Sequence, residues 1–234
     1  MMNKTKICIL GLIATAFGFQ SCLDTDTNGP EGVYDALVSV RVAQTGETYL
    51  RLDDETTLFP ENVTKPLFNG KHMRALVKYT ELDKTTPGYT KTVRLDRIDT
   101  IRTKQMEVVT ADKPLEAYGN DPIEIVNDWT TVLEDGFLTL RVRAPWSTAT
   151  HPHRLDLVGN VNSDNPYEVV LRHDADGDLY GQTADALIAF DLAMYVPQQP
   201  EPGTMLTVKW NSPTGMKEAK FEMKWKYLRH PWVE

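Results

Sequence analysis

The chain has 234 residues and an acidic balance, with 25 Lys and Arg against 33 Asp and Glu, which gives a net charge of −8. Proteins that bind nucleic acid by neutralising phosphates carry basic faces, so this balance argues against a nucleic-acid partner. The two cysteines, Cys8 and Cys22, both lie close to the N-terminus. We therefore expect a folded region without disulfides, thiolate metal sites or a cysteine nucleophile.

The first 21 residues have the pattern of an export signal. Two lysines precede an apolar run from residue 7 to 19, which is about 20 Å long as a helix and too short for a bilayer core of about 30 Å. The next residues complete the sequence FQSC, which resembles a lipobox, the site where lipoprotein signal peptidase cuts before an acylated cysteine. We expect residues 1–21 to be a lipoprotein signal peptide and Cys22 to be lipidated. The alternative is an ordinary signal with a chance cysteine.

Residues 22–32 are predicted to be a flexible tether, because they are acidic, contain Gly and Pro and have little apolar surface to bury. Several acyl chains on Cys22 would hold the protein stably at a membrane. Acidic residues soon after the lipidated cysteine resemble the surface-export signal of lipoproteins from some Gram-negative gut anaerobes. We expect an outer-membrane lipoprotein, either exposed on the cell surface or facing the periplasm.

Alternation with a period of two residues dominates the rest of the chain and predicts an all-β protein. Residues 33–110 form the first predicted β domain. Residues 111–122 contain two prolines and a glycine and are predicted to be a linker or long loop. The strands expected in the first domain are Ala36–Ala43, Thr48–Asp53, Arg74–Leu82 and Lys91–Ile98.

Residues 123–234 are predicted to form an antiparallel β-sandwich, since short strands with one apolar face are separated by regular turns. A Glu-Asp-Gly turn at 134–136 predicts a hairpin between its two flanking strands. A second turn at 212–215 predicts the last hairpin, whose apolar face includes Trp210 and Trp225. The expected strands are Trp129–Leu133, Phe137–Arg143, Arg154–Val158, Tyr167–His173, Leu187–Val196, Met205–Asn211 and Ala219–Tyr227.

Several of these features together resemble the NigD-like family of lipoproteins. The resemblance covers essentially the whole region after the signal and is carried by the lipobox and by two segments of the second half, DWTTVLEDGFLTLRVRAPWS and NPYEVVLRHDADGD. It implies a small N-terminal OB-type barrel followed by a C-terminal antiparallel β-sandwich. The family takes its name from a gene near a bacteriocin locus, which implies an immunity role. It supplies no catalytic residues.

Two metal sites can be considered from the spacing of side chains. Asp174, Asp176 and Asp178 have the 1-3-5 spacing of a calcium loop, but Leu179 stands where such a loop needs glycine and no helix flanks it. A β-turn rich in Asp and Gly is the expected structure. His151 and His153, with His173 elsewhere, could offer imidazoles to zinc, although the intervening proline indicates a loop. We expect no metal and no cofactor.

Catalytic motifs are weak. None of the serines lies in a Gly-x-Ser-x-Gly elbow, and Ser147, close to His151, is the one candidate nucleophile. Paired carboxylates for glycoside hydrolysis cannot be identified from spacing alone. We therefore expect a protein that is not an enzyme.

Aromatic and basic side chains suggest binding instead. Trp146 and Trp232 are the tryptophans expected at the surface, where an indole can stack on a sugar ring. A basic stretch from Lys91 to Lys104 could face nucleic acid or an acidic partner, but Asp96 and Asp99 dilute it and favour a solvated strand. The predicted function is a non-catalytic envelope lipoprotein that binds an extracytoplasmic protein. The alternative is a module that binds glycan or another envelope polymer.

Overall fold

The computed structural model describes residues 33–147, 152–193, 195 and 200–223. Strands dominate these residues, and the helical segments are two short 3₁₀ turns, so the expected all-β class is confirmed. The elements in chain order are β1 (Ala36–Val42), β2 (Thr48–Arg51), β3 (Thr57–Pro60), η1 (Leu67–Gly70), β4 (Met73–Glu81), β5 (Lys91–Thr100), β6 (Arg102–Gln105), β7 (Glu107–Val108), η2 (Leu115–Tyr118), β8 (Glu124–Val126), β9 (Val132–Glu134), β10 (Phe137–Trp146), β11 (Arg154–Gly159), β12 (Glu168–Asp174), β13 (Gln182–Asp191), β14 (Met205–Ser212) and β15 (Gly215–Glu222).

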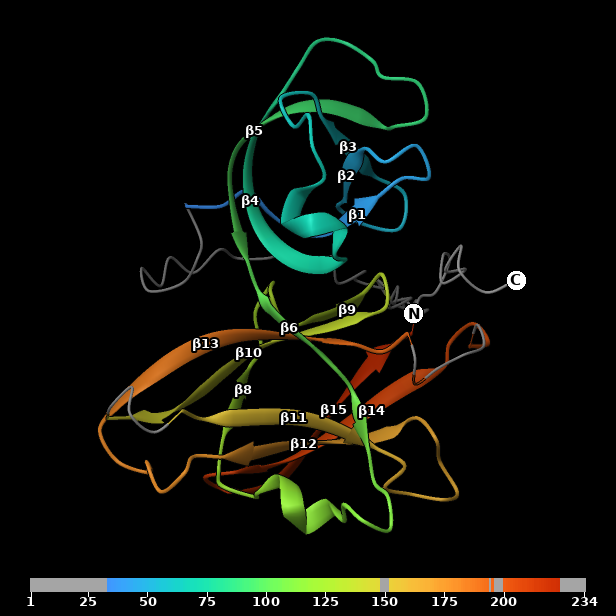
Figure 1. Ribbon diagram of the computed structural model, residues 1–234. Coiled ribbons are helices and arrows are strands. Elements are labelled where there is room, and N and C mark those ends of the chain that lie inside the picture. The colour runs from blue at the N-terminus through green and yellow to red at the C-terminus, as the bar shows by residue number, and fades with distance from the viewer. Residues whose placement is uncertain (1–32, 148–151, 194, 196–199, 224–234) are drawn as a thin grey trace, which may run out of the picture. The chain divides into compact units, whose positions relative to one another are not determined.

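Strands β1 to β5 close into a barrel in the order β1-β2-β3-β5-β4 (Figure 1). Alternate residues of β1 fill the barrel, where Val38 and Val40 are fully buried against Leu50, Leu58 and Val93. The opposite face of β1 is buried as well, although it carries Ser39 and Arg41. The first domain is therefore the expected OB-type barrel, with a strand that is covered on both sides.

The remaining strands form two sheets, one in the order β6-β13-β10-β8 with β9 beside β10, and one in the order β15-β14-β12-β11-β7. Figure 1 shows the long strands β10 and β13 running alongside each other, and they pair along their whole length, from Phe137 with Asp191 to Trp146 with Gln182. Most pairs are antiparallel, as expected for the sandwich. Three pairs are parallel: β6 with β13, β7 with β11 and β12 with β14.

The boundary between the two domains differs from the expected one. The last barrel strand ends at Thr100, and residues 102–108, which we assigned to the barrel, supply β6 to one sheet of the sandwich and β7 to the other. The expected linker at 111–122 contains η2, whose Tyr118 is buried. Short strands with polar side chains such as β6 show little alternation, which is why the sequence pattern did not separate them from the barrel.

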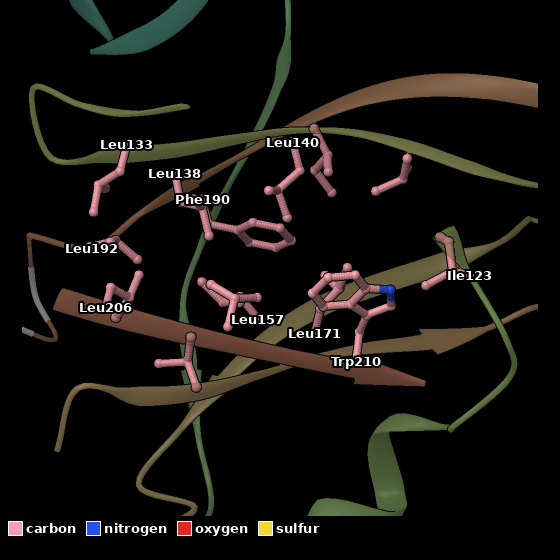
Figure 2. Close-up of a cluster of buried hydrophobic side chains, with 14 of the residues drawn as sticks. Ile123, Leu133, Leu138, Leu140, Leu157, Leu171, Phe190, Leu192, Leu206 and Trp210 are labelled. Atoms are coloured by element: carbon pink, nitrogen blue, oxygen red, sulfur yellow. The ribbon is translucent and has the colours of Figure 1, made fainter. Parts of the chain in front are cut away.

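The core of the sandwich lies between its two sheets. Figure 2 shows Leu138, Leu140 and Phe190 of one sheet facing Leu157, Leu171 and Trp210 of the other, and all six are nearly inaccessible to solvent. Trp210 is therefore a core residue, as the alternation of β14 predicted. Trp225 lies outside the described residues.

Candidate functional site

The candidate residues of the second domain meet at one end of the sandwich. Trp146 ends β10 and Ser147 follows it, His153 directly precedes β11, His173 belongs to β12, and Asp178 lies in the turn after β12. The pairing of β11 with β12 places residue 155 opposite His173, and this register brings His153 beside the buried imidazole of His173. The same end of the fold brings Ser147 and Asp178, which are 31 positions apart in sequence, into contact.

The two histidines form a hydrogen-bonded chain. Nδ1 of His173 lies 3.2 Å from the Pro122 carbonyl oxygen, and its Nε2 lies 2.9 Å from Nδ1 of His153. Because a carbonyl oxygen can only accept, His173 donates through Nδ1, and the neutral ring then accepts at Nε2 from His153. Burial lowers the pKa of His173 below its ordinary value, and the neighbouring His153 lowers it further. His173 is therefore held in the neutral form that this chain requires.

Asp178 connects the histidines to Ser147. Its carboxylate is almost completely buried and accepts hydrogen bonds from the backbone N–H of Ser147, at 3.0 Å, and from the Ser147 hydroxyl. Its Oδ2 lies 3.6 Å from Nε2 of His153. In a hydrolytic triad the histidine lies between the serine and the acid and takes the serine proton. Here the acid lies between them, so the order is not that of a hydrolytic triad, and the contacts of Asp178 hold the end of β10 in place.

The three aspartates of the possible calcium loop do not converge on one point. Asp174 pairs with Arg154 at 3.0 Å and accepts from the backbone N–H of Asp176 at 3.0 Å, whereas Asp178 faces Ser147. The segment is a turn, with Asp176 and Gly177 both at positive φ. Within residues 33–147, 152–193, 195 and 200–223, no group of three or more His, Cys, Asp or Glu side chains is placed to hold a metal ion. His151, the third candidate zinc ligand, lies outside these residues.

Trp146 is an exposed aromatic side chain at this end of the sandwich. Its ring stacks on His153, with centroids 4.4 Å apart and planes inclined by 17°, and 39% of the residue remains exposed. It lines a groove of about 540 Å³ together with His153 and groups of β6, β11 and β13. Trp129 is also exposed, at 37%, but does not line this groove. Trp232 lies outside the described residues.

Most of the basic stretch is neutralised, as the interspersed aspartates predicted. Arg94 pairs with Asp96, and Arg97 with Asp99. Further along the same stretch, Arg102 is exposed and its guanidinium has no hydrogen-bond or ion-pair partner among the described residues. Arg102 also lines the groove beside Trp146.

Sequence reasoning missed a buried ionic cluster between barrel and sandwich residues. The Glu134-Asp135 turn of the β9–β10 hairpin accepts from barrel arginines: Arg41 and Arg51 bind Asp135, and the fully buried Arg74 binds Glu134 at 3.0 Å. The available signal was the presence of arginines at alternate positions of otherwise apolar strands. That pattern is equally typical of a solvated face, and here the sandwich covers it.

The geometry thus defines a class of protein, a two-domain all-β chain with a closed five-stranded barrel followed by a two-sheet sandwich. Family models match both parts: the NigD-like N-terminal OB domain matches residues 37–101, and the NigD-like C-terminal beta sandwich domain matches residues 105–223. The chain belongs to the NigD-like family. The expected resemblance is therefore confirmed over both domains.

Solved structures with the same fold include proteins from Parabacteroides and Bacteroides species. A provisionally described toxin-related protein from Parabacteroides distasonis is 26% identical, with a TM-score of 0.67 over 81% of this chain and 93% of that one. A provisionally described lipoprotein from Bacteroides fragilis is 14% identical, with a TM-score of 0.56 over 82% and 99%. A NigD-like immunity protein from Bacteroides caccae is 18% identical, with a TM-score of 0.55 over 81% and 97%. No functionally curated protein matches the chain. Among the described residues, no helix is long and apolar enough to cross a bilayer.

Proposed function

We propose that this protein is a non-catalytic lipoprotein of the outer membrane, anchored through Cys22, that binds a protein partner outside the cytoplasm, with bacteriocin immunity as the specific role. The anchor rests on the lipobox-like sequence at residues 19–22 and is supported by the related lipoprotein of B. fragilis. The immunity role is supported by family membership and by the related immunity protein of B. caccae.

The observation that carries partner binding is an exposed apolar turn at the end of the sandwich. Tyr180 is 78% exposed and the adjacent Leu179 is 41% exposed. The turn is held in place, because Asp178 is buried against Ser147 and the glycine at 181 packs so tightly that an added Cβ would lie 2.7 Å from the Trp146 carbonyl oxygen. A fixed, exposed Tyr beside a Leu is typical of an anchor that a protein partner buries.

Catalysis receives no support from the same end of the molecule. The Ser147 hydroxyl donates to Asp178 and not to a histidine, so the pair lacks the histidine base of a serine hydrolase. The serine and the buried carboxylate are joined by hydrogen bonds, the two imidazoles by another, and Nε2 of His153 lies 3.6 Å from Oδ2 of Asp178, so three strand ends are held together. A role in fixing the recognition turn accounts for these contacts.

Photocrosslinking in intact cells tests the partner surface. A photoreactive residue at position 180 should give an adduct of one defined mass, whereas the same residue at Met216, which is 65% exposed on β15, should not. Leu179→Asp should abolish the adduct at position 180, because a charge would have to be buried in the interface. Equal adducts at both positions, or none at position 180, would contradict the proposed surface.

Labelling with a fatty acid tests the anchor separately. Cys22→Ser should lose the incorporated lipid and leave the membrane fraction, because the acyl chains supply the membrane affinity. Cys8→Ser is the matched control, since it removes the other thiol of the same segment and should keep both label and location. Retention of the label by Cys22→Ser would overturn the lipoprotein assignment and leave the partner surface to be judged by crosslinking.

A further inference from the structure

We propose that the groove beside Trp146 binds an acidic oligosaccharide, with one sugar ring stacked on the Trp146 indole and a carboxylate further along the chain bound by Arg102. The groove has a volume of about 540 Å³ and is lined by both residues and by Leu187 and Ile188 of β13. This ligand site is distinct from the exposed Leu179-Tyr180 turn, neither residue of which lines the groove. The proposal therefore goes beyond the protein-binding role.

Trp146 offers a fixed aromatic face. One side of its ring is stacked on His153, and His153 is fixed by its hydrogen bond to His173 and by its position beside Asp178. Holding the ring in place before binding reduces the conformational entropy that a ligand must overcome. The C–H groups on one face of a pyranose ring pack well against an indole, which combines apolar area with a flat shape.

The cations of the groove differ in what they can still bind. Lys104 already contacts the Leu155 carbonyl oxygen at 2.6 Å and the Asp156 carboxylate, and Arg154 pairs with Asp156 and Asp174. The guanidinium of Arg102 has no such partner among the described residues and is exposed. A planar guanidinium binds a carboxylate through two parallel hydrogen bonds, which makes Arg102 the group that selects an acidic ligand.

The spacing of the two groups requires an extended ligand. On β13, Gln182 lies opposite Trp146 and Ile188 lies opposite Arg102. These two positions of β13 are six residues apart, which corresponds to about 20 Å at the rise of a strand. A monosaccharide cannot reach from one group to the other over such a distance. A densely charged polymer such as nucleic acid is disfavoured, because Asp174 and Asp176 also line the groove. A chain of sugars with one carboxylate on some or all rings fits both constraints.

Isothermal titration of the purified protein tests the site. The acidic probes are tetragalacturonate, tetramannuronate and a hyaluronan tetrasaccharide, and the neutral ones are cellotetraose and β-1,4-galactotetraose. We expect at least one acidic tetrasaccharide to bind, and to bind at least ~10-fold more tightly than its monosaccharide and than the neutral tetrasaccharides. Arg102→Gln should weaken this binding ~10-fold, the value of one charge-assisted contact, and Trp146→Ala should weaken it by a similar factor. Trp129→Ala is the matched control, since Trp129 is equally exposed outside the groove, and it should bind as the wild type does.

Three results would overturn the proposal. The first is the absence of binding by all three acidic tetrasaccharides. The second is binding that neither Arg102→Gln nor Trp146→Ala weakens, or that Trp129→Ala weakens equally. The third is equal affinity for the neutral tetrasaccharides, because it would remove the role of Arg102. Arg102 is exposed, so its variant reports on binding even where Trp146→Ala impairs folding.

Discussion

Replacing Arg74 by Met tests whether the buried ionic cluster stabilises the fold. The Arg74 guanidinium donates to Ser39 at 3.0 Å, to Thr139 at 3.2 Å and to Glu134 at 3.0 Å, and the residue is 1% exposed. Burial lowers its pKa, but the facing Glu134 carboxylate opposes this effect and keeps the group charged. Methionine has a similar length and can fill the space without making any of the three hydrogen bonds.

The expected cost follows from what the substitution leaves behind. Ser39 and Thr139 are both fully buried, and each hydroxyl loses a donor where water cannot replace it, at about 1–3 kcal/mol per group. The Glu134 side chain is 34% exposed, so it regains water and adds less than a fully buried partner would. We expect a loss of about 3 kcal/mol in the free energy of unfolding, which lowers the melting temperature by about 6–12 °C in a chain of this size.

Urea unfolding followed by circular dichroism measures this loss. Arg94→Met is the matched control, because the Arg94 side chain is 58% exposed and pairs with Asp96 at the surface of β5, and we expect it to leave the midpoint almost unchanged. A loss below about 1 kcal/mol for Arg74→Met would refute the reasoning, since it would place the buried cluster among ordinary surface ion pairs.

Two further predictions concern the turn region of the sandwich. The pKa of His173 in the folded protein lies below its ordinary value, so the unfolded chain takes up the proton first as the pH falls. The free energy of unfolding should therefore decrease from about pH 6.5 downwards. His173→Gln should flatten the curve of the free energy of unfolding against pH between about 5 and 7. A dependence that is unchanged in the variant would contradict this assignment. Gly119→Ala should destabilise the fold more than Gly177→Ala, although both glycines have positive φ. An added Cβ at position 119 would lie 2.6 Å from the His173 carbonyl oxygen, whereas an added Cβ at position 177 would have no atom within 4 Å. Equal melting temperatures for the two alanine variants would show that the close contact relaxes.

Much of the fold could be predicted from alternation alone. The hairpin around Asp135 and the hairpin of β14 and β15 both have the expected turns, and Trp210 is buried as the pattern of β14 requires. Alternation fails where a strand is exposed on both faces. The first half of β13, from Gln182 to Ala186, is exposed throughout, and it was absent from the expected strand, which began at Leu187.

The candidate site was harder to predict because its members are distant in sequence. The sequence identified four side chains that could take part in catalysis or metal binding: Ser147, His153, His173 and Asp178. The spacing of these residues does not show that Asp178 lies between Ser147 and His153, or that the two histidines are in contact. The register of β11 against β12 and the turn after β12 decide both. Trp146 was expected at the surface. The groove that it lines is formed in part by Arg102 and Lys104 of β6, a strand that the sequence pattern did not predict.

The segment of residues 102–108 has a consequence for how the second domain reaches its native state. It forms the edge of one sheet beside β13 and the edge of the other beside β11, in both cases by parallel pairing with strands made 50 or more residues later. During synthesis these edges therefore stay open until β11 and β13 have emerged. A fragment that begins at residue 111 would lack β6 and β7. The backbone N–H and C=O groups of β13 and β11 that pair with them would then be free to pair with other chains. The sandwich should accordingly aggregate when it is produced without residues 102–108, even though its core residues are all present.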